Sequence, residues 1–155
     1  MKNILDLVTE EMNVTKDLIA KSYNAKGLKA SGKFERSLEV KIEQTSDGIK
    51  AKILGAYHTQ FMQNGRRPNK KQTKGQIYFL YKILEQWAID KGISINPYMA
   101  AKKTVYEGIK VPNPKNDGKF IDDVINESWL KQFSDKIRIA QIENIKSDIL
   151  KQWQP

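Results

Sequence analysis

Residue types that carry out catalysis are scarce in this chain. His58 is the only histidine, and there is no cysteine. A metal site built from several histidines or thiolates is therefore excluded, and so are a thiol nucleophile and a disulfide framework. One imidazole is left as a candidate base, and beside Tyr57, in a turn expected to be half-buried, we interpret it as a structural residue.

Carboxylates and glycines do not form a catalytic pattern either. Asp122 and Asp123 are adjacent in a segment expected to be helical, so their side chains point about 100° apart and do not converge. The nine glycines are scattered, and none begins the glycine-rich loop that precedes Lys-Ser or Lys-Thr in phosphate-binding turns. We therefore expect no enzymatic activity, no cofactor and no metal.

The unusual segment is YHTQFMQNGRRPNKKQTKGQIYF, residues 57–79, which contains no acid. Tyr57 and Phe61 are four residues apart, so a helical turn places both rings on one face. Gly65 can end that turn with a positive φ, and Pro68 stiffens the exit. The candidate site for an anion or a protein interface comprises Tyr57, Phe61, Gly65, Arg66, Arg67, Pro68, Lys70, Lys71 and Lys74. The alternative is a solvated loop whose charges only aid solubility.

Composition narrows the class of partner. The chain has 155 residues, enough for one domain, and 39% are hydrophobic, which predicts a thin core beneath a polar surface. Its 27 basic and 18 acidic residues give a net charge of +9. Such a surplus favours contact with nucleic acid, an anionic surface or an acidic protein. No apolar run is long enough to span a membrane, so we expect no membrane partner.

Hydrophobic periodicity predicts an α+β fold with a helix over residues 3–21 and a β-hairpin. Apolar residues alternate over residues 38–42 and again over residues 49–53, with Asp47-Gly48 as the turn between them. A helix ending at Gly92 buries a predicted stripe of Ile77, Leu80, Leu84 and Trp87.

The second half of the chain is predicted to consist of helices separated by loops. Asn96-Pro97 opens a helix that points Tyr98, Ala101 and Val105 inward. Residues 111–119 form a loop, because two prolines and Asp-Gly interrupt regular structure, and residues 120–127 form a short helix. A long C-terminal helix begins near Trp129, and its expected inward positions are Leu130, Phe133, Ile137, Ile145, Ile149 and Trp153.

Five motifs in order resemble the tail-completion and neck proteins of tailed bacteriophages. They are SGKFERSLEV, YHTQFMQNGRRP, IYFLYKILEQWAIDKGI, NPYMAAKKTVYEGI and KFIDDVINE. The resemblance covers residues 31–127, and residues 128–155 form a helical extension of the same single domain, residues 1–155. The positions that match the family pattern are Tyr57, Phe61, Gly65, Arg66, Pro68, Ile83, Trp87, Lys91, Gly92, Ile93, Ala101, Gly108 and Phe120.

The resemblance implies a non-enzymatic virion protein. It implies a ring of six or twelve identical subunits in the neck, made in the host cytoplasm, which joins the portal of the DNA-filled head to adjacent connector and tail proteins. Arg66 and Arg67 suit an interface, because a guanidinium binds carboxylates through two donors. Lys70, Lys71 and Lys74 suit diffuse contact with phosphates, and their partner is left open between packaged DNA and an acidic protein surface. A free-standing, sequence-independent DNA-binding protein is the alternative function.

Overall fold

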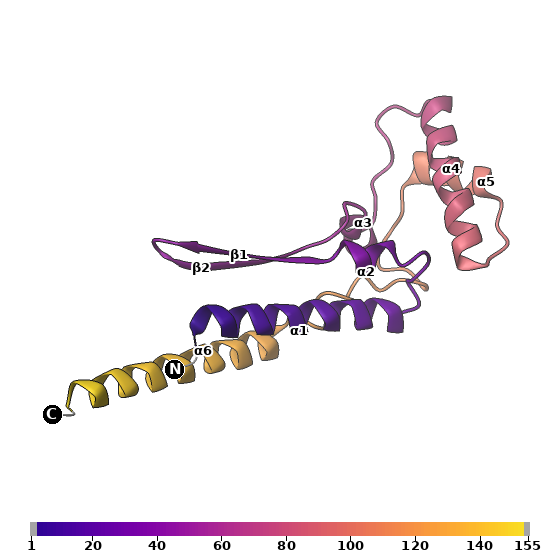
Figure 1. Cartoon of the computed structure of the whole chain (residues 1–155). Helices are drawn as coiled ribbons and strands as arrows, with labels where there is room; N and C mark the ends of the chain where they lie inside the picture. Colours follow the sequence, from indigo (N-terminus) through magenta and orange to yellow (C-terminus); the bar gives the residue numbers. More distant parts are fainter. Residues whose placement is uncertain (1–2, 154–155) are drawn as a thin grey trace.

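The computed structural model describes residues 3–153. The elements, in chain order, are α1 (Ile4–Ala25), α2 (Lys33–Ser37), β1 (Glu39–Thr45), β2 (Gly48–Leu54), α3 (Thr59–Asn64), α4 (Lys74–Lys91), α5 (Pro97–Glu107) and α6 (Glu127–Gln152). The α+β class is confirmed, with an N-terminal helix, an antiparallel hairpin, packed helices and a long C-terminal helix. The molecule is elongated, with the free end of α6 and the α4–α5 pair at opposite extremes (Figure 1).

Helix α1 and the hairpin form two layers of the main part of the molecule, which we call the body. The Asn3 side chain accepts a hydrogen bond from the Leu5 N–H and caps α1. The helix extends to Ala25, four residues beyond the predicted end. Its buried residues recur every three or four positions and are Leu7, Val8, Met12, Thr15, Ile19 and Tyr23. The hairpin therefore lies over an apolar stripe of α1 (Figure 1).

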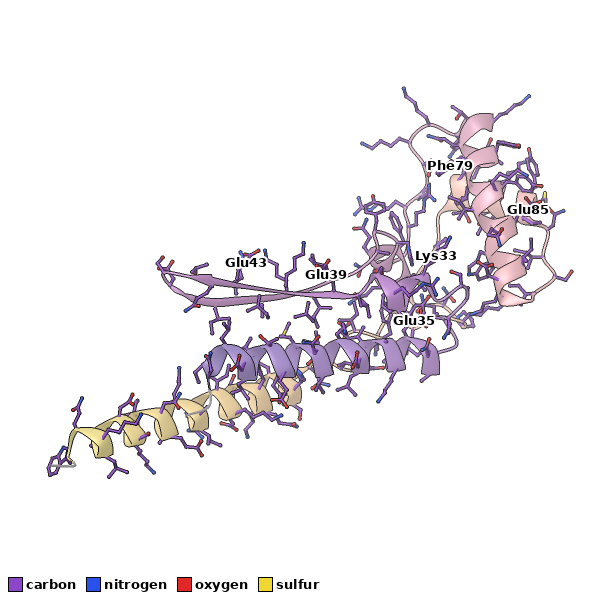
Figure 2. The ribbon with its side chains drawn as sticks, in the orientation of Figure 1. Lys33, Glu35, Glu39, Glu43, Phe79 and Glu85 are labelled. Carbon is purple, nitrogen blue, oxygen red and sulfur yellow. The ribbon has the colours of Figure 1, made fainter. Side chains whose placement is uncertain are left out.

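The predicted hairpin is confirmed, but its two turn residues are Ser46 and Asp47 in place of Asp47 and Gly48, because Gly48 already pairs with Thr45 as the first residue of β2. Val40 pairs with Ile53, Ile42 pairs with Ala51, and Thr45 pairs with Gly48 across the turn. Residues two apart share a face of a strand, and Figure 2 shows Glu39 and Glu43 on the face that points away from α1. The apolar residues of the hairpin consequently face α1.

Helices α4 and α5 pack against each other and form an antiparallel pair. Thr73 caps α4, Gly92 ends it in the left-handed conformation, and Asn96 caps α5 ahead of Pro97, as the sequence predicts for the last two caps. Ile77 and Leu80 are buried as expected. The two helices thus contact each other through a small set of apolar side chains.

Two predicted core positions of this pair are wrong. Trp87 is 37% exposed and Tyr98 is 49% exposed. The small side chains of Ala88 on α4 and Ala101 on α5 are buried instead. The large rings are consequently displaced to the outside of the pair.

The C-terminal region departs further from the expectation. The predicted helix over residues 120–127 is absent: Glu127 is the first residue of α6, and residues 120–126 do not form a helix. They form successive turns in which Asp123 N–H donates to Lys119 O and Val124 N–H donates to Ile121 O. Helix α6 is present, capped by Asn126, yet Ala140 is its only buried residue among those described.

The expected inward face of α6 is therefore mostly wrong. Leu130, Ile145, Ile149 and Trp153 are each more than half exposed, whereas Phe133 and Ile137 are half-buried. The reason is geometric. Helix α1 begins at Ile4, so it covers only the first half of the antiparallel α6, and the rest projects beyond it (Figure 1).

Buried apolar residues form two separate clusters. The first joins α1, α2 and the turns after residue 119 through Ile19, Tyr23, Phe34 and Phe120. The second lies within the α4–α5 pair and contains Ile77, Leu80, Ala101 and Val105. At the far end of α4, the Lys91 ammonium donates to the Gly27 and Lys29 carbonyls. This contact ties the pair to the body.

Candidate interface site: the basic loop

Residues 65–74, which we call the basic loop, follow α3 and its aromatic pair. The rings of Tyr57 and Phe61 meet edge to face with centroids 5.3 Å apart, which confirms their expected contact. Tyr57 is nevertheless 79% exposed and precedes α3, whereas Phe61 is half-buried. His58 is also exposed, contrary to the expected half-buried position; its carbonyl accepts from the Phe61 and Met62 N–H groups.

The first half of the basic loop is fastened to the end of α5 by its backbone. Gly65 has a φ of 75°, which confirms the predicted positive value. Arg66 N–H then donates to Ile109 O at 2.8 Å, and Ile109 N–H donates to Arg66 O at 2.7 Å. Asn69 N–H donates to Val105 O at 2.9 Å. These hydrogen bonds order residues 65–69, unlike a loop held only by its ends.

The two arginines have different surroundings. Arg66 is half-buried; its guanidinium donates to Asn69 Oδ1 at 2.8 Å and lies 5.9 Å from the centre of the Phe61 ring. Arg67 is exposed. Arg66 therefore already supports the loop internally, and Arg67 presents its whole guanidinium to solvent.

The lysines of the basic loop are exposed and unpaired. Lys70 and Lys71 lie in the loop, and Lys74 is the first residue of α4. Within residues 3–153, no carboxylate lies within ion-pair distance of these lysines or of Arg67. Unneutralised positive charge is thus concentrated at this end of α4, where it can attract phosphates or carboxylates.

Lys110 joins this charge although it is distant in sequence. It follows Ile109, and the pairing of Ile109 with Arg66 brings it opposite Gly65 at the base of the basic loop. Its side chain is exposed. The charge pattern of the sequence misses Lys110, because only the pairing of residues 66 and 109 reveals its proximity.

The C-terminal end of α3 is held by residues 111–123. Asn116 Nδ2 donates to Met62 O at 2.5 Å, and Gln63 Nε2 donates to Asp122 Oδ1 at 3.0 Å. Asp123 instead contacts the Lys26 ammonium at 2.7 Å. Asp122 and Asp123 thus contact different partners, which agrees with the prediction that their side chains diverge.

Lys26 links α1 to this segment through two carboxylates. Its ammonium lies 2.6 Å from Asp117 and 2.7 Å from Asp123. Hydrogen bonds to Asp117 and then Asp123 raise the pKa of Lys26, and the bond from Lys26 lowers the pKa of Asp117. These shifts follow from a structural ion pair at the surface.

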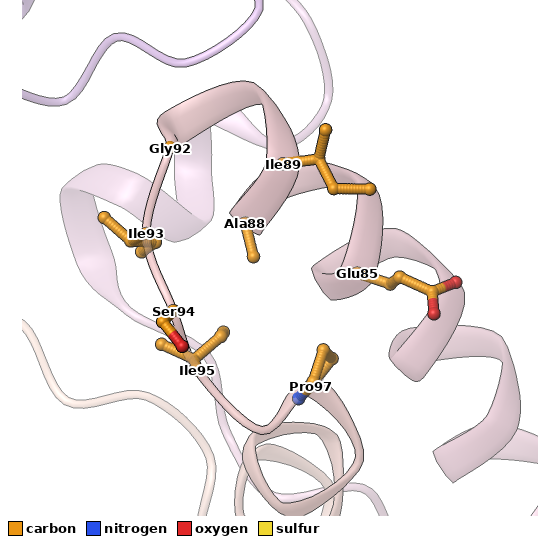
Figure 3. Close-up of a pocket in the computed structure, with 8 residues that line it drawn as sticks. All are labelled: Glu85, Ala88, Ile89, Gly92, Ile93, Ser94, Ile95 and Pro97. Carbon is orange, nitrogen blue, oxygen red and sulfur yellow. The ribbon is translucent and has the colours of Figure 1, made fainter.

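A shallow hollow lies between the end of α4 and the start of α5 and has a volume of about 500 Å³. Figure 3 shows isoleucines at its wall, with Glu85 at the edge as the only ionisable residue. The Tyr81 hydroxyl and then the Lys82 ammonium lower the pKa of Glu85 through hydrogen bonds of 2.6 and 3.1 Å. Its carboxylate is thereby committed to neighbours on α4.

The described residues contain no group of three or more histidine, cysteine or carboxylate side chains able to hold a metal ion. No helix within residues 3–153 has both the length and the apolar character of a membrane span. No protein-family model, curated protein or solved structure matches the chain. The geometry of the basic loop, with its exposed cations, is suited to binding anions and acidic surfaces.

Proposed function

We propose that the chain is a structural subunit of a tailed-phage virion and forms part of the ring-shaped neck between the portal and the tail. The observation that carries the proposal is the amount of large apolar surface left uncovered in an elongated subunit. Exposed large side chains occur on α4 and along the distal half of α6. Contiguous apolar surface of this extent marks a protein that is completed by neighbours.

The order of the family-like motifs supports the same proposal. The glycines at 65 and 108, both within those motifs, have positive φ values and meet at the pairing of Arg66 with Ile109. The motif residues therefore build one structural feature, the base of the basic loop. In the neck, Arg67 would bind carboxylates of an adjacent protein, and the loop lysines would face packaged DNA.

The location of the protein in particles tests this function. Antibodies raised against the purified chain are applied to particles of the phage whose genome encodes it, and the label is viewed by electron microscopy. We expect label at the junction of head and tail. Particles that lack the chain, or that carry it elsewhere, would contradict the proposal.

A free-standing DNA-binding protein is the second candidate. The exposed lysines of the basic loop favour it, because cations without protein partners are available for phosphates. The purified chain would then bind duplex DNA tightly at physiological salt, and virions would not contain it. Tight binding together with particle labelling would instead assign the DNA contact to the neck.

A further inference from the structure

Two apolar stripes lie on the surface at opposite ends of the molecule. The α4 stripe consists of Phe79, Ile83 and Trp87, which are 71%, 48% and 37% exposed. The α6 stripe consists of Ile142, Ile145, Ile149 and Trp153, which are 45%, 59%, 51% and 83% exposed. Residues three or four apart in a helix share one face, so each set forms a continuous row.

Within residues 3–153, no other element covers either stripe. Helix α5 covers the other side of α4, where Ile77 and Leu80 are buried. The α6 stripe lies beyond the part of α6 that α1 covers. Since the α4–α5 pair and the end of α6 lie at opposite extremes, the two stripes cannot meet in one subunit (Figure 1).

We propose that the α6 stripe of one copy of this chain packs on the α4 stripe of the next copy. Rows at i and i+4 on two helices interdigitate in the commonest packing of helices. This pairing covers both stripes of every subunit, whereas pairing α6 with α6 leaves the α4 stripe uncovered. Because the two surfaces differ, the contact is heterologous and repeats from copy to copy, closing into a ring where the rotation allows.

The area and the charge of the stripes suit a second copy as the occupant. Each half-exposed large side chain offers roughly 100 Å², so the seven side chains of the two stripes would bury about 700 Å² of apolar surface. With a polar rim around this apolar centre, the contact would reach the size of a standard interface, about 1,600 Å². Residues 139–153 carry two acids and two lysines, and residues 76–90 carry two acids and one lysine. The net charge of +9 therefore does not oppose the contact.

This inference deepens the proposed function, since it names the surfaces through which the ring closes. The absence of cysteine permits a direct test with single engineered cysteines. Ile83→Cys and Ile149→Cys are purified separately, then mixed under mild oxidation. We expect a disulfide-linked dimer in the mixture and none from either variant alone, because a disulfide needs Cα atoms within about 7 Å.

The matched control replaces Ile149→Cys by Ser147→Cys, which lies two residues away on α6 and therefore on the side of the helix opposite the stripe. It should give no dimer. A second measurement covers the case in which the chosen pair is too distant to bridge. Ile149→Asp should weaken self-association about tenfold or more, measured by sedimentation, whereas Ser147→Asp should not change it.

Dimers from Ile149→Cys alone would overturn the inference in favour of pairing between two α6 helices. Self-association unaffected by Ile149→Asp would overturn it too, as would a chain that stays monomeric at every concentration. The proposed function is judged separately by particle labelling. Labelled necks without the mixed disulfide and without an effect of Ile149→Asp would keep that function and remove this interface.

Discussion

The backbones of Arg66 and Ile109 pair through two hydrogen bonds of 2.8 and 2.7 Å. Each residue follows a glycine whose φ and ψ, 75° and −172° for Gly65 and 77° and −164° for Gly108, lie in a region populated almost only by glycine. A Cβ at Gly65 would meet the Ile109 carbonyl oxygen, and one at Gly108 would meet that of Arg66. The pairing therefore requires both glycines.

Gly108→Ala should lower the free energy of unfolding by at least about 2 kcal/mol, because it adds a clash to an unfavourable backbone conformation. Gly92→Ala is the control. Gly92 also has a positive φ, yet nothing lies within 4 Å of its would-be Cβ, so about 1 kcal/mol is expected. Urea unfolding followed by circular dichroism measures both. Equal losses would show that the close approach of the two backbones contributes nothing.

Phe120→Ala should destabilise the chain by about 3–5 kcal/mol, because it empties a fully buried site. The Phe120 ring lies 5.6 Å from those of both Tyr23 and Phe34. Trp87→Ala should cost the isolated chain less, about 1–2 kcal/mol, since Trp87 is partly exposed. Melting temperatures compare the two variants. A Trp87 variant as unstable as the Phe120 variant would place Trp87 in the core.

Stability should fall in alkaline solution because of Tyr23. Burial, with Glu35 as the second cause, raises the pKa of Tyr23 from 10.0 to about 12. The folded state keeps this proton after the unfolded chain has lost it, so the stabilisation is complete below about pH 10 and is lost as pH rises towards about 12. Between about pH 8 and 11.5, the free energy of unfolding of Tyr23→Phe should therefore fall by about 1–2 kcal/mol less than that of the parent.

Unfolding midpoints of parent and Tyr23→Phe, measured in steps from about pH 8 to 11.5, check this window. Lys26 also has a raised pKa, but it is present in both proteins, so their difference isolates the phenol. Parallel curves for the two proteins would mean that Tyr23 titrates normally in the folded chain.

Neutralising the loop lysines tests contact with DNA. If the basic loop binds duplex phosphates, Lys70, Lys71 and Lys74 changed together to Gln should reduce the slope of log affinity against log salt by roughly 3. A control with the same loss of charge changes Lys21, Lys131 and Lys146 to Gln, all exposed on α1 or α6. If both triple variants change the slope equally, DNA binding is not localised to the loop.

The arginines should matter to joining with a neighbouring protein. Arg67→Lys keeps the charge but loses the paired donors of the guanidinium, so we expect fewer complete particles. Arg66→Lys should act mainly through its internal contact with Asn69, and therefore lower stability by about 1 kcal/mol. Counts of joined particles and melting temperatures separate the two effects. Normal joining by Arg67→Lys, with failure only of the lysine variant, would reverse the assigned roles.

The local signals of the sequence determined the hairpin, the long helices and the caps at Gly92 and Asn96. The alternation of apolar residues in the two strands sets the register in which Val40 pairs with Ile53, because a shift by one residue would turn the apolar face outward. Asn96 and Gly92 likewise act through atoms within a few residues of themselves. Such features depend only on residues that are close neighbours in the sequence, so the sequence reveals them directly. The cluster of basic residues around Arg67 is equally visible, since charge needs no fold to be counted.

Only the tertiary structure decided which apolar stripes are buried. The periodicity of residues 145–153 is that of a helix with an apolar face. Whether Ile149 is covered depends on how far the N-terminal end of α1 reaches along α6. In the same way, Lys110 joins the basic loop only because Ile109 pairs with Arg66 across more than forty residues of chain. Contacts between distant segments depend on the packing of whole elements, and no short pattern encodes that packing.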